Sequence, residues 1–149
     1  MRNVIPDNDG RIFVLHVTDP GAGGYVEIGP PAGERWRLIS VTCTFTTSAA
    51  VANRQVSWRC LEALYGTICF CGIFSTIQVA SLVRGYHFMD GQSQAPYDIS
   101  GVFMGGLPTG IRLVYGLKLI IDAINLQAAD AFTNIYVVAQ KWIDPEIIV

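Results

Sequence analysis

Residues Trp36–Leu61 contain two long stretches in which apolar and polar side chains alternate, and this alternation constrains the fold more than any other feature. In the first stretch the apolar positions are Ile39, Val41, Cys43 and Phe45. In the second stretch they are Val56, Trp58 and Cys60. A period of two residues is typical of a β-strand that buries one face. The sequence therefore predicts two long β-strands in this region.

The segment that joins the two stretches, Ser48–Asn53, is too short and too rich in small residues to form a helix of its own. Its last residue, Asn53, tolerates the left-handed backbone conformation that turns often need. We therefore expect the two strands to form an antiparallel pair at the centre of an all-β domain, with the other strands layered onto this pair.

Clusters of glycine, proline, asparagine and aspartate divide the rest of the chain into further strand candidates. These candidates are Arg11–Thr18, Tyr25–Ile28, Thr67–Phe74, Ile77–Met89, a single bent strand formed by Ile111–Tyr115 and Leu117–Ile121, and Phe132–Ile143. Between them, Asp90–Ser100 is the longest polar loop, and we interpret Asp122–Asp130 as a loop rather than a helical turn.

This pattern gives about eight short strands and no long amphipathic helix, which indicates a sandwich or a jelly roll. We predict a single-domain antiparallel β-sandwich, jelly-roll-like, over residues 11–143. Residues 1–10 are predicted to form an N-terminal arm, and residues 144–149 a C-terminal tail.

Composition limits the classes of partner. The chain has 149 residues, of which 51% are hydrophobic and 15% charged, and this apolar balance favours contacts that are buried between subunits. The net charge is −2 and the basic residues are scattered, so no nucleic-acid partner is predicted. No apolar run reaches the roughly 18 residues of a membrane span, so no membrane partner is predicted either. The polar start of the chain does not resemble a signal peptide, and we expect synthesis without export.

The four cysteines are interpreted as thiols, because the expected compartment is the reducing cytoplasm. Cys43 and Cys60 lie on the apolar faces of their strands and are predicted to be core residues. Cys69 and Cys71 have C-x-C spacing, which places both sulfurs on one face of a strand. This pair lacks a second pair of ligands and a neighbouring histidine, so we predict no metal site and no cofactor.

Residues suited to catalysis are sparse. His16 and His87 both lie within strand-like runs, and neither neighbours a nucleophile motif such as G-x-S-x-G. Both are interpreted as satisfied or surface histidines, and the protein is predicted not to be an enzyme.

Several residues are candidates for contacts between subunits. The apolar terminal residues would be unfavourable in water and could dock on a neighbouring subunit or fold back on their own domain. They are Val4, Ile5, Ile147, Ile148 and Val149. Trp36, Trp58 and Trp142 are predicted packing anchors. Arg37 and Arg54 are candidate polar partners at a subunit contact, with solvated arginines as the alternative.

Two stretches, Ala32–Trp58 and Leu107–Ile143, resemble small β-sandwich structural proteins of tailed bacteriophages. The shared features are a Trp-Arg strand that runs into Thr-Thr-Ser, a Val-x-Asn-Arg segment, a Leu-Pro segment, an Asn-Leu-Gln-x-x-Asp turn and a last strand that ends near Trp. These stretches make up a little under half of the chain. The sequence departs from the pattern in its cysteines and over Cys69–Ser100.

The resemblance implies a capsid decoration (cement) protein. Such a protein is often a homotrimer at local three-fold positions, where it binds the major capsid protein on the outer surface of the virion and stabilises the shell. Many weak contacts repeated over a symmetric shell add up by avidity.

The sequence is also compatible with two other functions. One is a phage tail or head-fibre adhesin that binds host carbohydrate through exposed aromatic residues such as Tyr86, Tyr97 and Phe103. The other is an enzyme such as a small cupin-like barrel, against which the two distant histidines argue because a cupin needs a histidine-rich metal cluster.

Overall fold

The computed structural model describes residues 10–62, 64–92, 97–99 and 101–143, all of which form strands or loops. The described residues form eleven strands: β1 (Arg11–Val17), β2 (Val26–Ile28), β3 (Glu34–Thr46), β4 (Gln55–Glu62), β5 (Ile68–Ile73), β6 (Val83–Asp90), β7 (Tyr97–Ile99), β8 (Val102–Leu107), β9 (Arg112–Leu113), β10 (Leu117–Ile124) and β11 (Ala131–Ile143). No helix long and apolar enough to cross a membrane occurs in this part of the chain.

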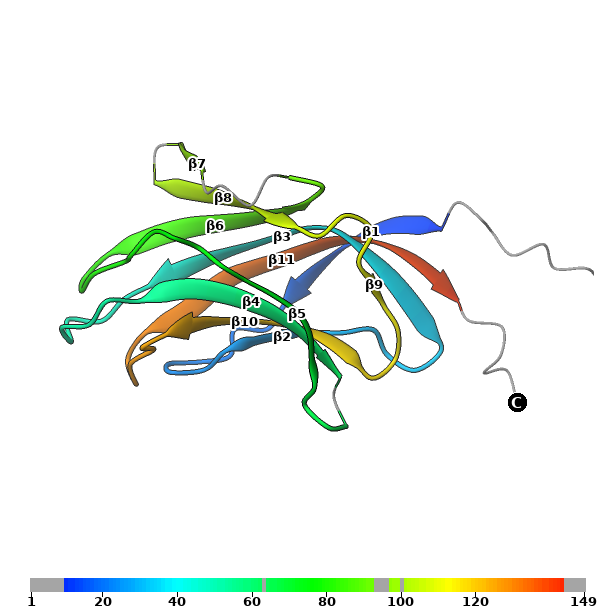
Figure 1. The fold of residues 1–149 in the computed structure, drawn as a ribbon, viewed down its shortest axis with the longest axis horizontal. Helices are drawn as coiled ribbons and strands as arrows, with labels where there is room; N and C mark the ends of the chain where they lie inside the picture. Colours follow the sequence, from blue (N-terminus) through cyan, green and yellow to red (C-terminus); the bar gives the residue numbers. More distant parts are fainter. Residues whose placement is uncertain (1–9, 63, 93–96, 100, 144–149) are drawn as a thin grey trace, which may run out of the picture.

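The strands form two sheets that pack face to face as a sandwich (Figure 1). Sheet A has seven strands in the order β1-β11-β3-β6-β8-β7, and β9 also pairs with β3. Sheet B has four strands in the order β2-β10-β4-β5. The predicted all-β sandwich is therefore confirmed.

Strand pairing is nested along the chain. The first strand pairs with the last in β1–β11, and the next pairs inward are β2–β10, β3–β6 and β4–β5. Successive pairs alternate between sheet A and sheet B. The chain therefore runs as one long folded-back ribbon that is rolled into two layers.

The predicted central pair is wrong in one respect, because its two strands lie in different sheets. β3 belongs to sheet A and β4 to sheet B. Each strand carries a continuous apolar face, and both faces contribute to one hydrophobic core between the layers. Facing layers bury both apolar faces against each other, so the connection 47–54 crosses the sandwich instead of closing a hairpin.

The alternation in β3 is interrupted by a β-bulge. Ser40 lies opposite Val138 and Leu38 opposite Ala139, so Ile39 is the extra residue on β3. A bulge shifts the alternation by one residue. The buried positions are consequently Trp36 and Leu38 before it and Val41, Cys43 and Phe45 after it, whereas Ile39 is only half-buried.

Three other details differ from the prediction. The strand count is eleven rather than about eight, and β7 lies inside the predicted long loop. The sandwich is not purely antiparallel, because β8 pairs with β6 in parallel. The proposed bent strand over 111–121 is two strands, since β9 pairs with β3 in sheet A and β10 with β4 in sheet B. Gly116 lies between them with a φ of 90°, a left-handed conformation that favours glycine.

Aromatic residues fill the core between the sheets. Phe74 contacts Tyr86 and Phe88 edge-on, with ring centroids 5.2 Å apart in each case, and Tyr86 in turn contacts Phe103. Gly105 on β8 leaves room for the Phe74 ring, because a Cβ there would lie 2.5 Å from Phe74 Cζ.

The predicted burial of Cys43 and Cys60 is confirmed, and all four cysteines are free. Burial raises the pKa of the Cys43 thiol to about 12. Burial, together with the neighbouring Cys69, raises the pKa of Cys60 to about 11. Both core thiols are therefore protonated and unreactive at neutral pH.

Candidate interaction surface

The terminal residues predicted to clamp a neighbour lie outside the described part of the chain. They are Val4, Ile5, Ile147, Ile148 and Val149. Their role stays a prediction.

The three tryptophans take different places. Trp36 and Trp58 are buried in the core, as expected for packing anchors, and Trp36 Nε1 donates a hydrogen bond to Glu34 at 2.7 Å. Trp142 lies near the end of β11 and is half-buried. The Arg112 guanidinium lies over its ring, 5.9 Å from the centroid. Trp142 is therefore the tryptophan that retains surface for a contact with another molecule.

Arg54 lies inside its own domain. Its side chain is 0% exposed and pairs with Asp130, with Nε 2.9 Å from Oδ2. Its remaining N–H groups donate to the carbonyl oxygens of Ala50 and Ala52 and to Ser48 Oγ. The guanidinium thus holds the crossover 47–54 against the turn before β11, and its donors are used within the chain.

Asp130 is the acceptor at the centre of this network. Burial by itself would raise the pKa of its carboxyl group, but hydrogen bonds from Arg54, Ser48 and the Gln127 backbone outweigh burial and lower the pKa to about 2. The carboxylate therefore stays charged at neutral pH, and the pair stabilises the fold rather than a surface contact.

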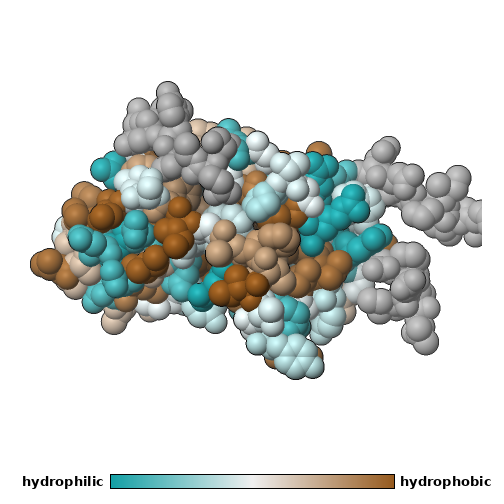
Figure 2. Space-filling model, in the orientation of Figure 1, coloured by the Kyte–Doolittle hydropathy of each residue, from teal (hydrophilic) through white to brown (hydrophobic). Residues whose placement is uncertain are grey.

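Arg37 lies at the end of sheet A where β1 begins and β11 ends. Arg37 Nη2 lies 2.8 Å from Asp90 Oδ2, and the side chain of Arg37 is partly exposed. In register, Arg37 lies opposite Arg112, and Arg35 lies opposite Trp142. Hydrophilic residues gather at this end in Figure 2. We call this end of the sheet, which contains Arg35, Arg37, Arg112 and Trp142, the basic end. Arg37 and Trp142 are both accessible there.

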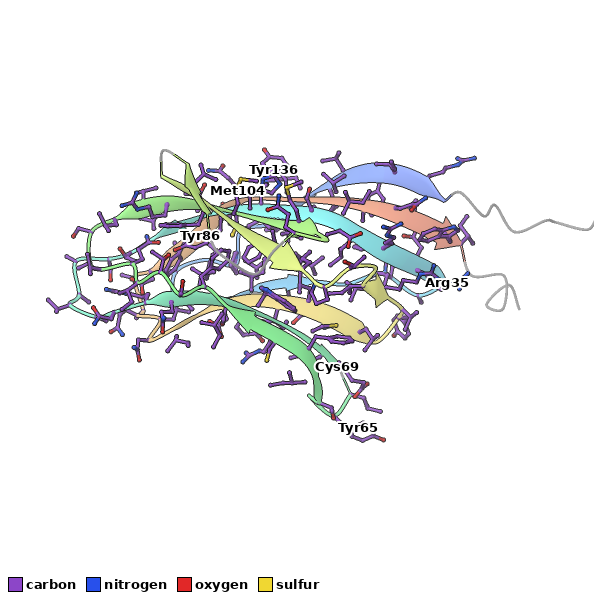
Figure 3. The ribbon with its side chains drawn as sticks, turned by 45° about the horizontal axis from the view of Figure 1, so that its top comes forward. Arg35, Tyr65, Cys69, Tyr86, Met104 and Tyr136 are labelled. Carbon is purple, nitrogen blue, oxygen red and sulfur yellow. The ribbon has the colours of Figure 1, made fainter. Side chains whose placement is uncertain are left out.

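Beyond the basic end, the outer face of sheet A carries no charged residue at its central positions. One cross-strand row joins His16, Tyr136, Thr42, His87 and Met104. The rows on either side contain Val14, Val138, Ser40 and Met89, and Thr44, Gly85 and Val102. We call these twelve residues the neutral face. Tyr136 and Met104 mark it in Figure 3, where their side chains lie on the outer side of the sheet.

The neutral face is partly apolar and partly exposed. Val14 is 67% exposed, Tyr136 46% and Val102 41%. The His16 and Tyr136 rings contact each other, with centroids 4.8 Å apart. Burial lowers the pKa of His87, so this imidazole is uncharged at neutral pH. Uncharged and aromatic residues are typical of the centre of a protein–protein interface.

The outer face of sheet B has a different character. Lys118 pairs with Glu27, and Arg59 Nη2 lies 3.4 Å from Asp122 Oδ2. These pairs surround Ile120, which faces outward in register and is nevertheless buried. The centre of this face is therefore covered by ion pairs and is suited to water, whereas Ile73 and Ile124 towards its margins are exposed. The centres of the two outer faces thus differ in what they can bind.

The size of the neutral face decides how much of an interface it can supply. Five strands spaced about 4.8 Å apart and three rows about 7 Å apart span roughly 300 Å². A stable contact buries about 800 Å² on each partner. The neutral face can therefore form the core of an interface, with a polar rim that includes the basic end.

The described residues provide no evident catalytic constellation. His16 and His87 lie in one row but three strand spacings apart, about 14 Å, which is too far to bind one metal ion. No group of three or more histidine, cysteine, aspartate or glutamate residues comes together in the described ranges. A recess of about 10 Å³ between Trp58, Ile73, Phe74, Gly105 and Gly106 has room for one water molecule.

Two of the three aromatic residues considered for carbohydrate binding are not available at the surface. Tyr86 and Phe103 are 1% and 5% exposed and belong to the core. Tyr86 lies between the sheets in Figure 3, and its hydroxyl donates to Gln78 Oε1 at 2.9 Å. The side chain of Tyr97 lies outside the described residues.

Comparison of the chain with protein-family models, curated proteins and solved structures finds no match.

Sequence reasoning missed the neutral face because the rows depend on which strands pair. The signal was present in one strand, where Thr42 and Thr44 alternate with apolar residues and form an uncharged outward side. The equivalent residues of β6, β8 and β11 belong to the same face only because β11 and β6 flank β3 and β8 follows β6.

Proposed function

We propose that the protein is a capsid decoration protein. In this proposal it associates as a homotrimer, binds the major capsid protein on the outer surface of a tailed-phage head, and stabilises the shell of the virion. It requires no cofactor and catalyses no reaction. The observation that carries the proposal is the contrast between the neutral face of sheet A and the ion-paired outer face of sheet B.

The strand order supports the architecture that the proposal requires. We assign the sandwich to the jelly rolls, because nested pairing from β1–β11 inward to β4–β5 gives two layers from one folded-back ribbon. Jelly rolls are common among viral capsid domains and lectins. The three remaining strands, β7, β8 and β9, lie between β6 and β10 in the chain as an insertion.

The lectin-like alternative is an adhesin that binds host carbohydrate. It has less support, because Tyr86 and Phe103 are core residues that cannot stack on a sugar. We therefore expect no binding to immobilised glycans.

The test is co-sedimentation of the purified protein with empty heads of tailed bacteriophages. Wild type is expected to sediment with the shells. Tyr136→Glu places a charge on the neutral face, so it is expected to weaken self-association and the multivalent binding that depends on it, and to stay in the supernatant. Ile124→Glu is the matched control, because Ile124 is 41% exposed on the outer face of sheet B. Equal binding by both variants, or binding to immobilised glycans in place of shells, would contradict the proposal.

A further inference from the structure

A second apolar surface lies on the hairpin formed by β4 and β5. The hairpin extends away from the sandwich, with Tyr65 near its tip and Cys69 on β5 (Figures 1 and 3). Its exposed apolar residues are more than half exposed: Leu64, Tyr65, Ile68, Phe70 and Ile73. A surface of this kind marks an interaction site.

The hairpin is exposed on both of its faces. In register, Phe70 lies opposite Cys60 and therefore points to the core side, whereas Ile73 lies opposite Ser57 and points outward. Phe70 is nevertheless 52% exposed and Ile73 56%. Among the described residues, sheet A thus leaves the hairpin uncovered on the core side, which makes this side available to another molecule.

The edge of β5 is poorly suited to pairing with another strand. Cys60 lies opposite Phe70 and Leu61 opposite Ile68, so Cys69 is an extra residue that forms a bulge. The bulge also breaks the alternation that was predicted to put Cys69 and Cys71 on one face. Bulges on edge strands hinder the addition of a further strand. We therefore expect contacts through the side chains of the hairpin rather than through its backbone edge.

We propose that the hairpin of one copy of this chain packs on the neutral face of the next copy, in a head-to-tail contact that closes into a ring of three. This inference rests on the self-association proposed above and names the two surfaces that would make it. The hairpin and the neutral face lie on opposite sides of the molecule in Figure 3, so they cannot meet within one chain.

Size and charge both favour this occupant. The six residues of β5 extend about 20 Å, which matches the width of about 20 Å across the five strands of the neutral face. β5 contains no charged residue, and the neutral face contains no aspartate, glutamate, lysine or arginine, so a contact between the two leaves no such charge unpaired. The charged residues of the hairpin lie on β4, where Arg59 pairs with Asp122 and the Glu62 carboxylate accepts hydrogen bonds from the backbone N–H groups of Leu64 and Tyr65. The face of sheet B, with its ion pairs, would leave charges buried against the hairpin.

Symmetry decides between the two ways in which copies can meet. Two hairpins that met across a two-fold axis would form a dimer and leave every neutral face uncovered. A head-to-tail contact uses both surfaces of every copy, and it produces a closed ring when the rotation between copies allows closure.

The test uses the exposed thiols of Cys69 and Cys71 as reporters. A cysteine is placed on the neutral face by Val14→Cys, His87→Cys or Val102→Cys, and a mild oxidant is added. We expect a ladder of covalent dimers and closed trimers for at least one variant, with peptide mapping that links the new cysteine to Cys69 or Cys71. The same variants with Cys69→Ser and Cys71→Ser serve as controls, and they are expected to form no ladder.

A second measurement leaves the cysteines unchanged. Replacing Leu64 and Tyr65 with serine is expected to raise the concentration of half-assembly at least about tenfold, because apolar anchors dominate such contacts. Both side chains are exposed in the single chain, so the fold should be retained, and Val51→Ser is the matched control because Val51 is 97% exposed elsewhere. Hairpin-to-hairpin dimers overturn this inference. A trimer that is insensitive to the hairpin variants and gives no ladder would also overturn this inference. That result would leave the trimer of the proposed function intact, because only the contact between hairpin and neutral face would be wrong.

Discussion

Asp130 carries a buried negative charge, and this charge is stable because Arg54, Ser48 and Gln127 donate hydrogen bonds to its carboxylate. Arg54 donates through Nε and Nη2, and the Ser48 and Gln127 backbones donate as well. These four donors and the Ser48 hydroxyl, which also donates to the carboxylate, belong to two segments of the chain, the crossover 47–54 and the turn before β11. The pair therefore fixes the crossover between the sheets to the start of β11.

Removal of the cation from this pair should be costly. Arg54→Ala leaves the Asp130 carboxylate buried without its partner, and we expect a loss of about 3–5 kcal/mol in the free energy of unfolding. Urea denaturation measures this loss. The control is Arg59→Ala, which breaks the partly exposed pair with Asp122 and should cost about 1 kcal/mol or less. Similar losses for the two variants would argue against a structural role for the buried pair.

The same carboxylate predicts a pH dependence of stability. The pKa of Asp130 is lowered to about 2 in the folded chain, and an unfolded aspartate titrates near 3.9. The contribution is therefore complete above about pH 4 and is lost as the pH falls towards 2; it amounts to about 2 kcal/mol. Urea midpoints between pH 5 and pH 2 should fall for wild type, and the gap between wild type and Asp130→Asn should narrow. A constant gap would contradict the assigned pKa.

At the scale of strands, the aromatic core depends on glycines that admit rings. A Cβ on Gly105 would lie 2.5 Å from Phe74 Cζ, whereas a Cβ on Gly85 would lie 3.3 Å from Val102 Cγ2 on the outer face. The two glycines lie on neighbouring strands of sheet A. They provide a matched pair for testing how tightly the core is packed.

We expect Gly105→Ala to lower the free energy of unfolding by about 1–3 kcal/mol, because the core must shift to admit the methyl group. Gly85→Ala should cost less, since Val102 lies at the surface and can move. Thermal and urea unfolding of the two variants measure the difference. A larger loss for Gly85→Ala would show that the assignment of inner and outer faces is wrong.

Local pattern predicted most strands but not their partners. The ranges proposed for β1, β2, β5 and β11 agree with the structure within two residues, because their β-branched and aromatic content is bounded by turns. The layer of each strand could not be read from the pattern, since a strand with one apolar face can belong to either sheet. The bulges at Ile39 and Cys69 were also hidden, because they appear only in the register with a partner strand. Of the candidate site residues, Arg37 and Trp142 are accessible and Arg54 is not. The burial of Arg54 could not be predicted from the sequence, because its partner Asp130 lies 76 residues further along the chain.

At the scale of the whole molecule, the proposed association should respond to pH through the neutral face. Burial lowers the pKa of His87 in the single chain, and a partner would bury it further. Its neighbours in the row are Thr42 and Met104, which supply no charge to offset an imidazolium. Association is therefore expected to weaken as the pH falls below the usual histidine pKa of about 6.5, with the largest effect once His87 is protonated.

This prediction is checked by sedimentation velocity between pH 8 and pH 5. The variant His87→Gln, which cannot be protonated, should retain more of its association at pH 5 than wild type. Identical pH profiles for the two proteins would show that His87 is not part of the contact.

Association through the neutral face is tested by the mass of the purified chain, measured by light scattering over a range of concentrations. A mass near three times the 16.3 kDa of one chain is expected for wild type and for Ile124→Glu. For Tyr136→Glu, the mass is expected to fall towards that of a single chain. A single-chain mass for wild type at every concentration, or a trimer that Tyr136→Glu leaves unchanged, would contradict association through the neutral face.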